Sequence, residues 1–395
     1  LCSKLNCFDS LIPRNFLFIL LSKMTKAPTA TGPAIGPRPT SSIPTRYFIF
    51  INTDIHFYIK QYTINFSLWY TSIMSNFTHL HTHSHYSLLT ALPKIDDLVK
   101  QAKKYSMKSL AITDNGNLYG AIEFYKTCQK AEIKPIIGVD FYVAVRSRKD
   151  MQAGIDNRRT RLVMLALNNK GYKNLIKLVT DSHLEGFYYK PRIDKELIQK
   201  YQEGIIAISP SFSGEIVQAL KSRNQDKAIE IANYYKQIFT PHTNENGEKI
   251  IDRFFIEITK HPEIDGHEEN MQNLIAFAKE QNIPIMAAHD VYYLAPEDRF
   301  ARETLVRVNS HSDNSEKISD SDEDDFSFIS PERATELFKD LPEALDNTAK
   351  IADLCDADRH RRSPRRSRQE LGASAACSPA NGRIWRGEIG RASCR

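Results

Sequence analysis

Four histidines at alternate positions form the stretch of this sequence that is best suited to chemistry. They are His79, His81, His83 and His85, in the run His-Leu-His-Thr-His-Ser-His. In an extended segment, residues i and i+2 point to the same side, so these imidazoles share one face. Imidazole suits Zn, Mn or Fe, and a strand that supplies two ligands needs others from elsewhere in the fold. The spacing therefore predicts a divalent metal site, and the alternative is a structural role for the histidines.

Short β-branched runs alternate with amphipathic helical stretches between residues 74 and 355, which is typical of βα units around a mainly parallel sheet. We predict strands at Phe77–Leu80, Ser109–Thr113, Pro135–Val143, Leu162–Leu167, Ile205–Ile208, Phe254–Ile258 and Ile285–Ala288. Helices fit at 94–105, 118–131, 171–182, 213–222, 226–239 and 267–281. Six or seven such units favour an α/β fold with a TIM-like (β/α) barrel over an open sheet. In either architecture, the site lies at the carboxyl ends of the strands.

An acidic run at residues 320–325 follows the last predicted strand. It lacks the Gly and the final Glu of an EF-hand calcium loop, so we interpret it as a solvated surface loop. Two more helices are predicted to begin near Pro331 and Pro342.

Composition and charge exclude several classes of protein. With 41% apolar and 26% charged residues, the chain resembles a soluble globular protein. The net charge of +5 arises in the two flanks, residues 1–73 and 359–395, whereas residues 74–358 are acidic. The net charge of the whole chain therefore gives no argument for nucleic-acid binding. The middle contains two cysteines, Cys128 and Cys355, which indicates a reduced, cytoplasmic protein without disulfides. The longest apolar run, 16–21, is too short to cross a membrane, so we expect no membrane partner.

The two flanks differ in character from the middle. We interpret residues 1–73 as translated upstream DNA, with Met74 as the native start, and the alternative is a genuine disordered extension. At the other end, helical patterning stops near residue 355 and an arginine-rich tail follows over 356–395. A basic arm can bind nucleic acid. Its last eight residues instead resemble a translated sequencing adapter, so we interpret the tail as artefactual and the gene as cut off near residue 355.

Five segments resemble, in order, the polymerase and histidinol phosphatase (PHP) domain that opens the alpha subunit of bacterial DNA polymerase III. These segments are 77–89, 110–120, 134–142, 171–175 and 288–294. A sixth segment, 342–352, resembles the connector toward the polymerase palm, which free-standing phosphoesterases lack. The resemblance implies a PHP barrel domain over 74–310, followed by an acidic loop and a short helical connector over 311–355.

The resemblance also implies a set of metal ligands, which this sequence keeps in part. Positions that keep the ligand or replace it conservatively are His81, His83, Asp140, His261 and Asp290. Positions that lose it are Thr90, Asn115, Arg161 and Tyr292. A guanidinium cannot ligate a metal and stays charged in proteins, so Arg161 argues most strongly against an intact multi-metal cluster. Two alternatives stay open: one residual Zn or Mn ion on the surviving ligands, or a metal-free site held by hydrogen bonds.

The resemblance further implies that the full-length protein is a DNA-directed DNA polymerase, a nucleotidyltransferase that binds DNA and uses Mg in its palm. The PHP domain is then a structural part without assigned catalytic residues. It contacts the proofreading exonuclease subunit and other subunits of the replicase. Two alternatives for this domain are an active metal-dependent 3′–5′ exonuclease or pyrophosphatase, and a free-standing phosphatase of small phosphoesters.

Overall fold

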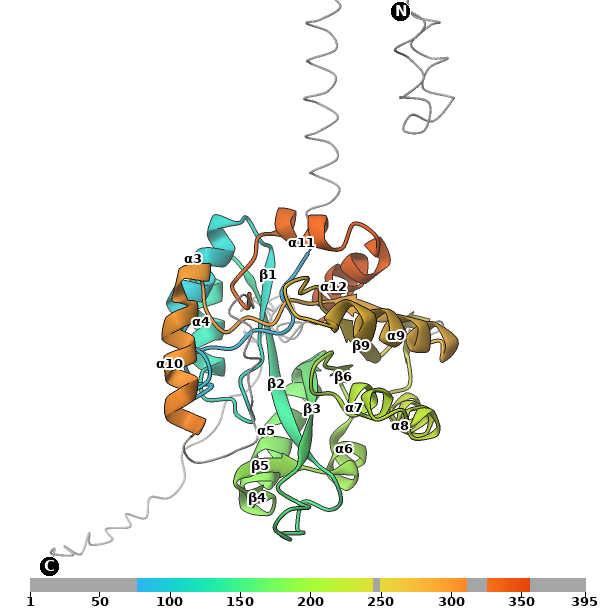
Figure 1. Ribbon diagram of the computed structural model, residues 1–395. Coiled ribbons are helices and arrows are strands. Elements are labelled where there is room, and N and C mark those ends of the chain that lie inside the picture. Colours follow the sequence, from blue (N-terminus) through green and yellow to red (C-terminus); the bar gives the residue numbers. More distant parts are fainter. Residues whose placement is uncertain (1–76, 244–248, 311–324, 356–395) are drawn as a thin grey trace, which may run out of the picture. The chain divides into compact units, whose positions relative to one another are not determined.

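The computed structural model describes residues 77–243, 249–310 and 325–355 (Figure 1). The predictions for residues 1–73, for most of the acidic loop and for the tail lie outside the described residues. Within them, helices surround a curled central sheet (Figure 1). None of the helices in these ranges has the length and apolar character that a membrane span requires.

The central sheet has the strand order β10-β9-β6-β3-β2-β5-β4, and β1 also pairs with β2. Its strands are β1 Ser109–Ile112, β2 Lys134–Ala144, β3 Arg159–Ala166, β4 Phe187–Tyr188, β5 Lys190–Ile193, β6 Ile205–Ser209, β9 Phe254–Ile258 and β10 Ile285–Ala287. A separate hairpin joins β7 His242–Thr243 to β8 Lys249–Ile251. Every residue of β1, β6, β9 and β10 is buried, as expected for strands that are covered on both faces.

Residues 79–83 join the two edges of this sheet. The backbone N–H of Thr113, just after β1, donates to the carbonyl oxygen of Thr82 at 2.8 Å. The N–H of His83 donates to the carbonyl oxygen of Val291 at 3.0 Å, just beyond β10, and Thr82 and Val291 form a parallel bridge. This segment therefore acts as the seventh strand of the barrel, together with β1, β2, β3, β6, β9 and β10. Its pairing extends to residue 83, beyond the end of the predicted strand at 77–80. The prediction of a TIM-like barrel of about seven units is confirmed.

The prediction of a mainly parallel sheet is wrong for β3. This strand runs antiparallel to both of its neighbours, β2 and β6. The reason lies in the connection from β2 to β3, residues 145–158, which contains no helix. A parallel neighbour needs a crossover, usually helical, whereas an irregular loop can return the chain directly alongside the strand it has just left. The sequence pattern of β3 is equally apolar in either direction, so it did not reveal the reversal.

Ten α-helices are present in the described residues. They are α3 Ile95–Lys104, α4 Ala121–Ala131, α5 Asn169–Leu184, α6 Lys195–Tyr201, α7 Glu215–Lys221, α8 Gln225–Ile238, α9 His267–Glu280, α10 Arg299–Ser310, α11 Pro331–Leu337 and α12 Pro342–Leu354. The predicted inner face of α3 is buried throughout. The sequence analysis missed α6 and α10. For α6 a signal was available, because the Asp194 carboxylate caps it by accepting a hydrogen bond from the Leu197 N–H at 3.1 Å.

The last two helices pack onto the barrel. The side chain of Asn347 in α12 donates to the carbonyl oxygen of Ile285 in β10 at 2.8 Å. Lys134 at the start of β2 reaches the Asp353 carbonyl oxygen at 2.7 Å. Phe338, which ends α11, is fully buried in the same core as the barrel helices. The predicted connector helices thus share the core of the barrel that they follow.

Close backbone contact between α5 and the loop before β6 requires glycine at position 171. A Cβ added there would lie 1.8 Å from the carbonyl oxygen of Gly204, which no side-chain rotation can relieve. We expect Gly171→Ala to lower the free energy of unfolding by about 1–3 kcal/mol in urea denaturation. The control is Lys173→Ala on the exposed side of the same helix, which should change it by less than about 0.5 kcal/mol. Equal stability of the two variants would contradict this packing.

Candidate metal centre

Four of the five predicted metal ligands converge inside the barrel. His81 and His83 come from the seventh-strand segment, Asp140 from β2, and Asp290 follows β10. All four side chains are buried. They meet because strands far apart in the sequence are neighbours around the barrel, so that each brings its polar residue to the same interior volume.

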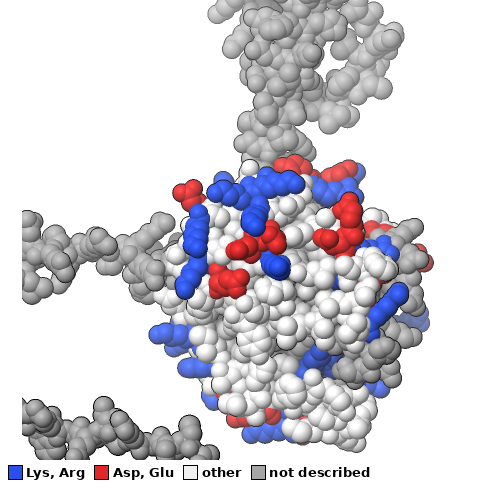
Figure 2. Space-filling view, turned by 90° about the vertical axis from the view of Figure 1, so that its left-hand side faces the viewer, with Lys and Arg blue, Asp and Glu red and all other residues white. Residues whose placement is uncertain are grey.

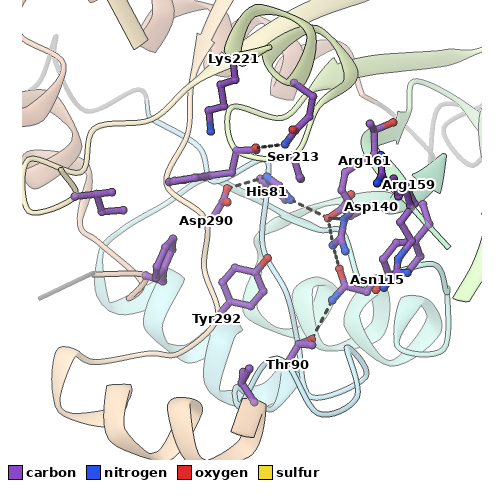
Figure 3. A pocket seen from close by; sticks show the side chains of 18 of the residues that line it. His81, Thr90, Asn115, Asp140, Arg159, Arg161, Ser213, Lys221, Asp290 and Tyr292 are labelled. Carbon is purple, nitrogen blue, oxygen red and sulfur yellow. Dashed lines mark hydrogen bonds and ion pairs between the residues drawn. The ribbon is translucent and has the colours of Figure 1, made fainter. Parts of the chain in front are cut away.

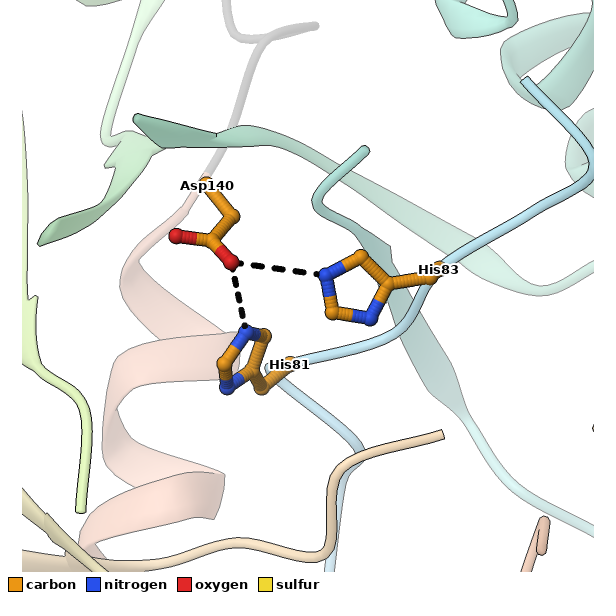
Figure 4. Close-up of side chains that lie close together, drawn as sticks. All are labelled: His81, His83 and Asp140. Atoms are coloured by element: carbon orange, nitrogen blue, oxygen red, sulfur yellow. Dashed lines mark hydrogen bonds and ion pairs between the residues drawn. The ribbon is translucent and has the colours of Figure 1, made fainter. Parts of the chain in front are cut away.

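His81, His83 and Asp140 form one group that could hold a metal ion (Figure 4). The Asp140 Oδ2 atom lies 3.4 Å from His81 Nε2 and 3.5 Å from His83 Nε2. The other carboxylate oxygen, Asp140 Oδ1, and the His83 Nδ1 atom are buried without a hydrogen-bond partner. Unpaired buried polar atoms are costly and need an explanation, and a coordinated cation is one explanation.

A second group consists of His81, Glu257 and Asp290. The His81 Nδ1 atom lies 2.8 Å from Glu257 Oε2 and 2.9 Å from Asp290 Oδ1. Glu257 also accepts hydrogen bonds from the backbone N–H and the hydroxyl of Ser211, both at 3.1 Å. Sequence reasoning did not assign Glu257 to the site. A signal was present, because Glu257 is the one charged residue in the strand Phe-Phe-Ile-Glu-Ile and is completely buried.

Arg161 enters the first group from β3 (Figure 3). Its Nε–H donates to Asp140 Oδ2 at 3.0 Å, and its Nη2 makes close contacts to the same oxygen and to Asn115 Oδ1. The guanidinium also lies over the Tyr142 ring, 4.4 Å from its centroid. The carboxylate oxygen that His81 and His83 share is therefore already bound to a fixed positive charge.

Two of the positions that depart from the expected ligand set, Arg161 and Tyr292, contact surviving ligands directly. Thr90 Oγ1 accepts a hydrogen bond from Asn115 Nδ2 at 2.9 Å, so Thr90, Asn115, Arg161 and Asp140 form a continuous chain of hydrogen bonds (Figure 3). Tyr292 stacks on His83 with ring centroids 4.4 Å apart and planes at 10°. Thr90, Asn115 and Arg161 thus form one hydrogen-bonded arrangement, and Tyr292 packs separately on His83.

His261 lies outside both groups. Its Nδ1 atom is 3.2 Å from Glu263 Oε1, its Nε2 atom has no hydrogen-bond partner, and its ring stacks on His289 with centroids 5.0 Å apart. The structure therefore brings together four of the five predicted ligands, and it adds Glu257.

The ionisable side chains of the site shift one another's pKa values. Burial alone would lower the pKa of His81, but the carboxylates of Asp290 and Glu257 outweigh it and hold this pKa well above its usual value. Burial would raise the pKa of Asp140, but Arg161 holds it well below its usual range. For Asp290, His81 likewise overcomes burial and keeps the pKa at about 2. Two cations, the His81 imidazolium and the Arg161 guanidinium, therefore pair with three carboxyl groups, those of Asp140, Asp290 and Glu257, and burial raises the pKa of Glu257.

A pocket of about 790 Å³ opens onto these residues. Five of its lining side chains are Lys or Arg: Arg158, Arg159, Arg161, Lys221 and Arg302. Arg302 comes from α10, which sequence reasoning missed, and its guanidinium lies 4.4 Å from the Tyr292 ring centroid. The positively charged lining adds to the electrostatic cost of binding a further cation in this volume.

The residues present do not fit a multi-metal cluster. Such a cluster needs bridging carboxylates and free imidazoles, with each ion held by several ligands. Here Asp140, the carboxylate between the two imidazoles, is bound to Arg161, and His81 Nδ1 is paired with Glu257 and Asp290. We therefore derive no reaction step through a metal ion.

Comparisons with known proteins show what this chain is similar to. The family described as "PHP domain" matches residues 79–261. DNA polymerase III subunit alpha of Borreliella burgdorferi is 41% identical over 288 residues, which cover 72% of this chain and 24% of that protein. The subunits of Helicobacter pylori and Thermus aquaticus are 37% and 38% identical over 71% of this chain and 23% of theirs. The chain thus spans about a quarter of the length of these curated relatives.

Among solved structures, an amidohydrolase from Chromobacterium violaceum aligns over 58% of this chain and 96% of its own, with 12% identity and a TM-score of 0.34. A similarity of this size carries no argument about function.

Proposed function

The chain belongs to the PHP-domain family found in DNA polymerase III alpha subunits, and we propose that its barrel is a structural, non-hydrolytic domain of such a polymerase. The observation that carries this proposal is the ion pair of Arg161 with Asp140. An arginine stays charged at every accessible pH, so it supplies permanently the positive charge that a metal ion would bring. In this proposal the site keeps a positive charge beside Asp140 but lacks the metal cluster that would activate water.

The activity of the whole protein is part of this proposal. Its curated relatives are named DNA polymerase III subunit alpha, so we propose template-directed DNA synthesis by a polymerase domain outside the described residues. That domain would use Mg²⁺, bind DNA and work in the cytoplasm within a replicase. On the face in Figure 2, Lys and Arg side chains lie among Asp and Glu, and a broad area has neither. This supports a role for that face in protein contact rather than in DNA binding.

Partner binding is the second part of the proposed role. We propose that the domain braces the polymerase module and contacts the proofreading exonuclease subunit. The predicted division into a barrel over 74–310 and a connector over 311–355 remains part of this proposal. The packing of α12 on β10 supports it, because a connector fixed to the barrel transmits the position of the barrel to whatever follows.

A hydrolysis assay tests the non-catalytic role. The full chain is incubated with Mn²⁺ and either 3′-labelled single-stranded DNA or pyrophosphate, next to the variant His81→Ala/His83→Ala. We expect both proteins to give the same background rate, because the intact site cannot hold the metal cluster that hydrolysis needs. A rate at least tenfold higher for the wild-type chain would contradict the proposal, since a contaminating nuclease would contribute equally to both samples.

The second candidate function is metal-dependent phosphoester hydrolysis, as an exonuclease or a phosphatase. The observation in its favour is the pair of three-residue groups that share His81. A single Zn or Mn ion on His81, Glu257 and Asp290 would avoid Arg161 but must displace the proton of His81. The hydrolysis assay distinguishes this candidate from the structural role, because only an active site loses rate when His81 and His83 are removed.

A further inference from the structure

An exposed apolar surface lies at the end of α5 and on the hairpin that follows it. Four large apolar side chains point to solvent: Ile176, Leu184, Phe187 and Tyr189, which are 43%, 79%, 53% and 56% exposed. We call these four residues the hairpin surface. Single exposed apolar residues are ordinary, but four within fourteen positions of one helix–hairpin unit suggest a site of contact with another molecule.

The backbone at Tyr189 is in the left-handed region, with φ of 61°. Four other non-glycine residues with positive φ end helices, where this conformation is common: Ser106, Glu132, Arg223 and Asn282. Tyr189 instead lies between β4 and β5. A bulky residue in this conformation costs about 1–2 kcal/mol, and such strain tends to persist where it serves a function.

Buried contacts hold the hairpin in this conformation. Arg192 is completely buried, and its guanidinium donates to the carbonyl oxygen of Gly186 at 3.1 Å and to that of Arg148 at 2.7 Å. The same guanidinium lies 5.2 Å from the ring centroid of Tyr188. Tyr188 thus packs on Arg192 while its neighbours Phe187 and Tyr189 are left exposed. A rigid surface of this kind loses little conformational entropy on binding.

Two lysines beside the hairpin surface have no ion-pair partner among the described residues. Lys173 and Lys177 lie on the exposed side of α5, next to Ile176. Neither forms an ion pair with any residue that the structure describes, and Lys177 lies over the Tyr201 ring at 5.5 Å. Of the acidic residues nearby, Glu185 and Asp194 are bound to Arg148, and Asp181 lies on α5 between Lys177 and Leu184. The surface therefore combines apolar side chains with unpaired positive charge.

We propose that the hairpin surface binds an acidic amphipathic segment of a partner protein. Apolar side chains of that segment cover Leu184, Phe187 and Tyr189, and its carboxylates pair with Lys173 and Lys177. Electrostatic complementarity of this kind sets the specificity and the speed of association. The inference rests on the proposed protein-binding role of the domain, but it does not depend on the state of the metal centre.

The test uses a fluorescein-labelled 16-residue peptide with Leu at positions i, i+3, i+4 and i+7 and Glu on the remaining helix face. We expect its fluorescence anisotropy to rise when the full chain is added, and its affinity to fall at least tenfold for Phe187→Ser. Tyr189→Gly relieves the strained backbone, so it should keep or raise thermal stability while binding still falls tenfold. Phe300→Ser on α10, 75% exposed in the wild type, is the matched control and should bind as the wild type does.

Charge is tested with the variant Lys173→Glu/Lys177→Glu and with a peptide that has Lys in place of Glu. We expect the variant to bind the acidic peptide at least tenfold more weakly, and the basic peptide not to bind the wild-type chain. Equal binding of both peptides, or unchanged binding by Phe187→Ser, would overturn the inference. The inference would also be overturned if the chain formed a dimer that Phe187→Ser abolished. The molecule bound at the hairpin surface would then be a second copy of the chain. Each of these outcomes leaves the metal-free proposal intact.

Discussion

Asp140→Asn is expected to lower the free energy of unfolding by about 3–5 kcal/mol, because it leaves the Arg161 guanidinium in a largely buried site without its counter-charge. The Arg161 side chain is only 11% exposed and that of Asp140 only 2%, so water cannot compensate for the lost carboxylate. The double variant Asp140→Asn/Arg161→Met removes both charges and should be more stable than Asp140→Asn alone. Urea denaturation of the full chain, with and without EDTA, measures these values.

The matched control is Asp97→Asn, which breaks the exposed ion pair between Asp97 and Lys100 at 3.0 Å and should change stability by less than about 0.5 kcal/mol. EDTA should leave the wild-type transition unchanged. If Asp140→Asn were as stable as the wild type, or the double variant less stable than the single one, Arg161 would not be the structural cation of this site. A fall in wild-type stability on adding EDTA would point instead to a bound metal ion.

The second large effect is a gain of metal binding. We expect Asn115→His/Arg161→His/Tyr292→His to retain at least about one Zn²⁺ or Mn²⁺ ion per chain after dialysis, because three imidazoles replace the guanidinium, the amide and the phenol around Asp140. The wild-type chain should retain none. Element analysis by mass spectrometry measures the metal content, and thermal unfolding with added metal gives an independent readout.

Arg159→His is the control for this gain, because Arg159 lines the same pocket but lies opposite Ala144 of β2 rather than opposite Asp140. It should not create metal binding. If the triple variant stays metal-free while folded, the remaining ligands cannot converge on an ion, and the loss of the metal site involves more than the substituted positions. If Arg159→His binds metal equally well, the effect reflects added surface histidine.

The sequence predicted most elements of the barrel, because each strand is an apolar run of the right length and each main helix has a buried stripe. It did not predict the reversal of β3, since strand direction depends on the connection at residues 145–158 and not on the apolar pattern of the strand itself. It also missed α6, α10 and the short hairpins. The hairpin strands are too short to show periodicity, whereas α10 was missed although it spans 12 residues.

The candidate site, too, could be predicted only in part. Alternation within the histidine run correctly predicted that His81 and His83 lie close together, and the family resemblance located Asp140 and Asp290. Glu257 and Arg302 were missed, because their role depends on which strands and helices become neighbours around the barrel. That Arg161 bonds Asp140 and Asn115 together could not be read from the sequence, since the three residues are separated by up to 46 positions.

The metal content of the wild-type chain tests the central claim most directly. The full chain is purified without chelators, dialysed against Mn²⁺ and then Zn²⁺, freed of unbound metal and subjected to element analysis. Because Arg161 and His81 already pair with the carboxyl groups of the site, we predict less than about one-tenth of an ion per chain. One or more ions per chain, lost in the variant His81→Ala/His83→Ala, would contradict the account and restore the metal-dependent hydrolase as the better description.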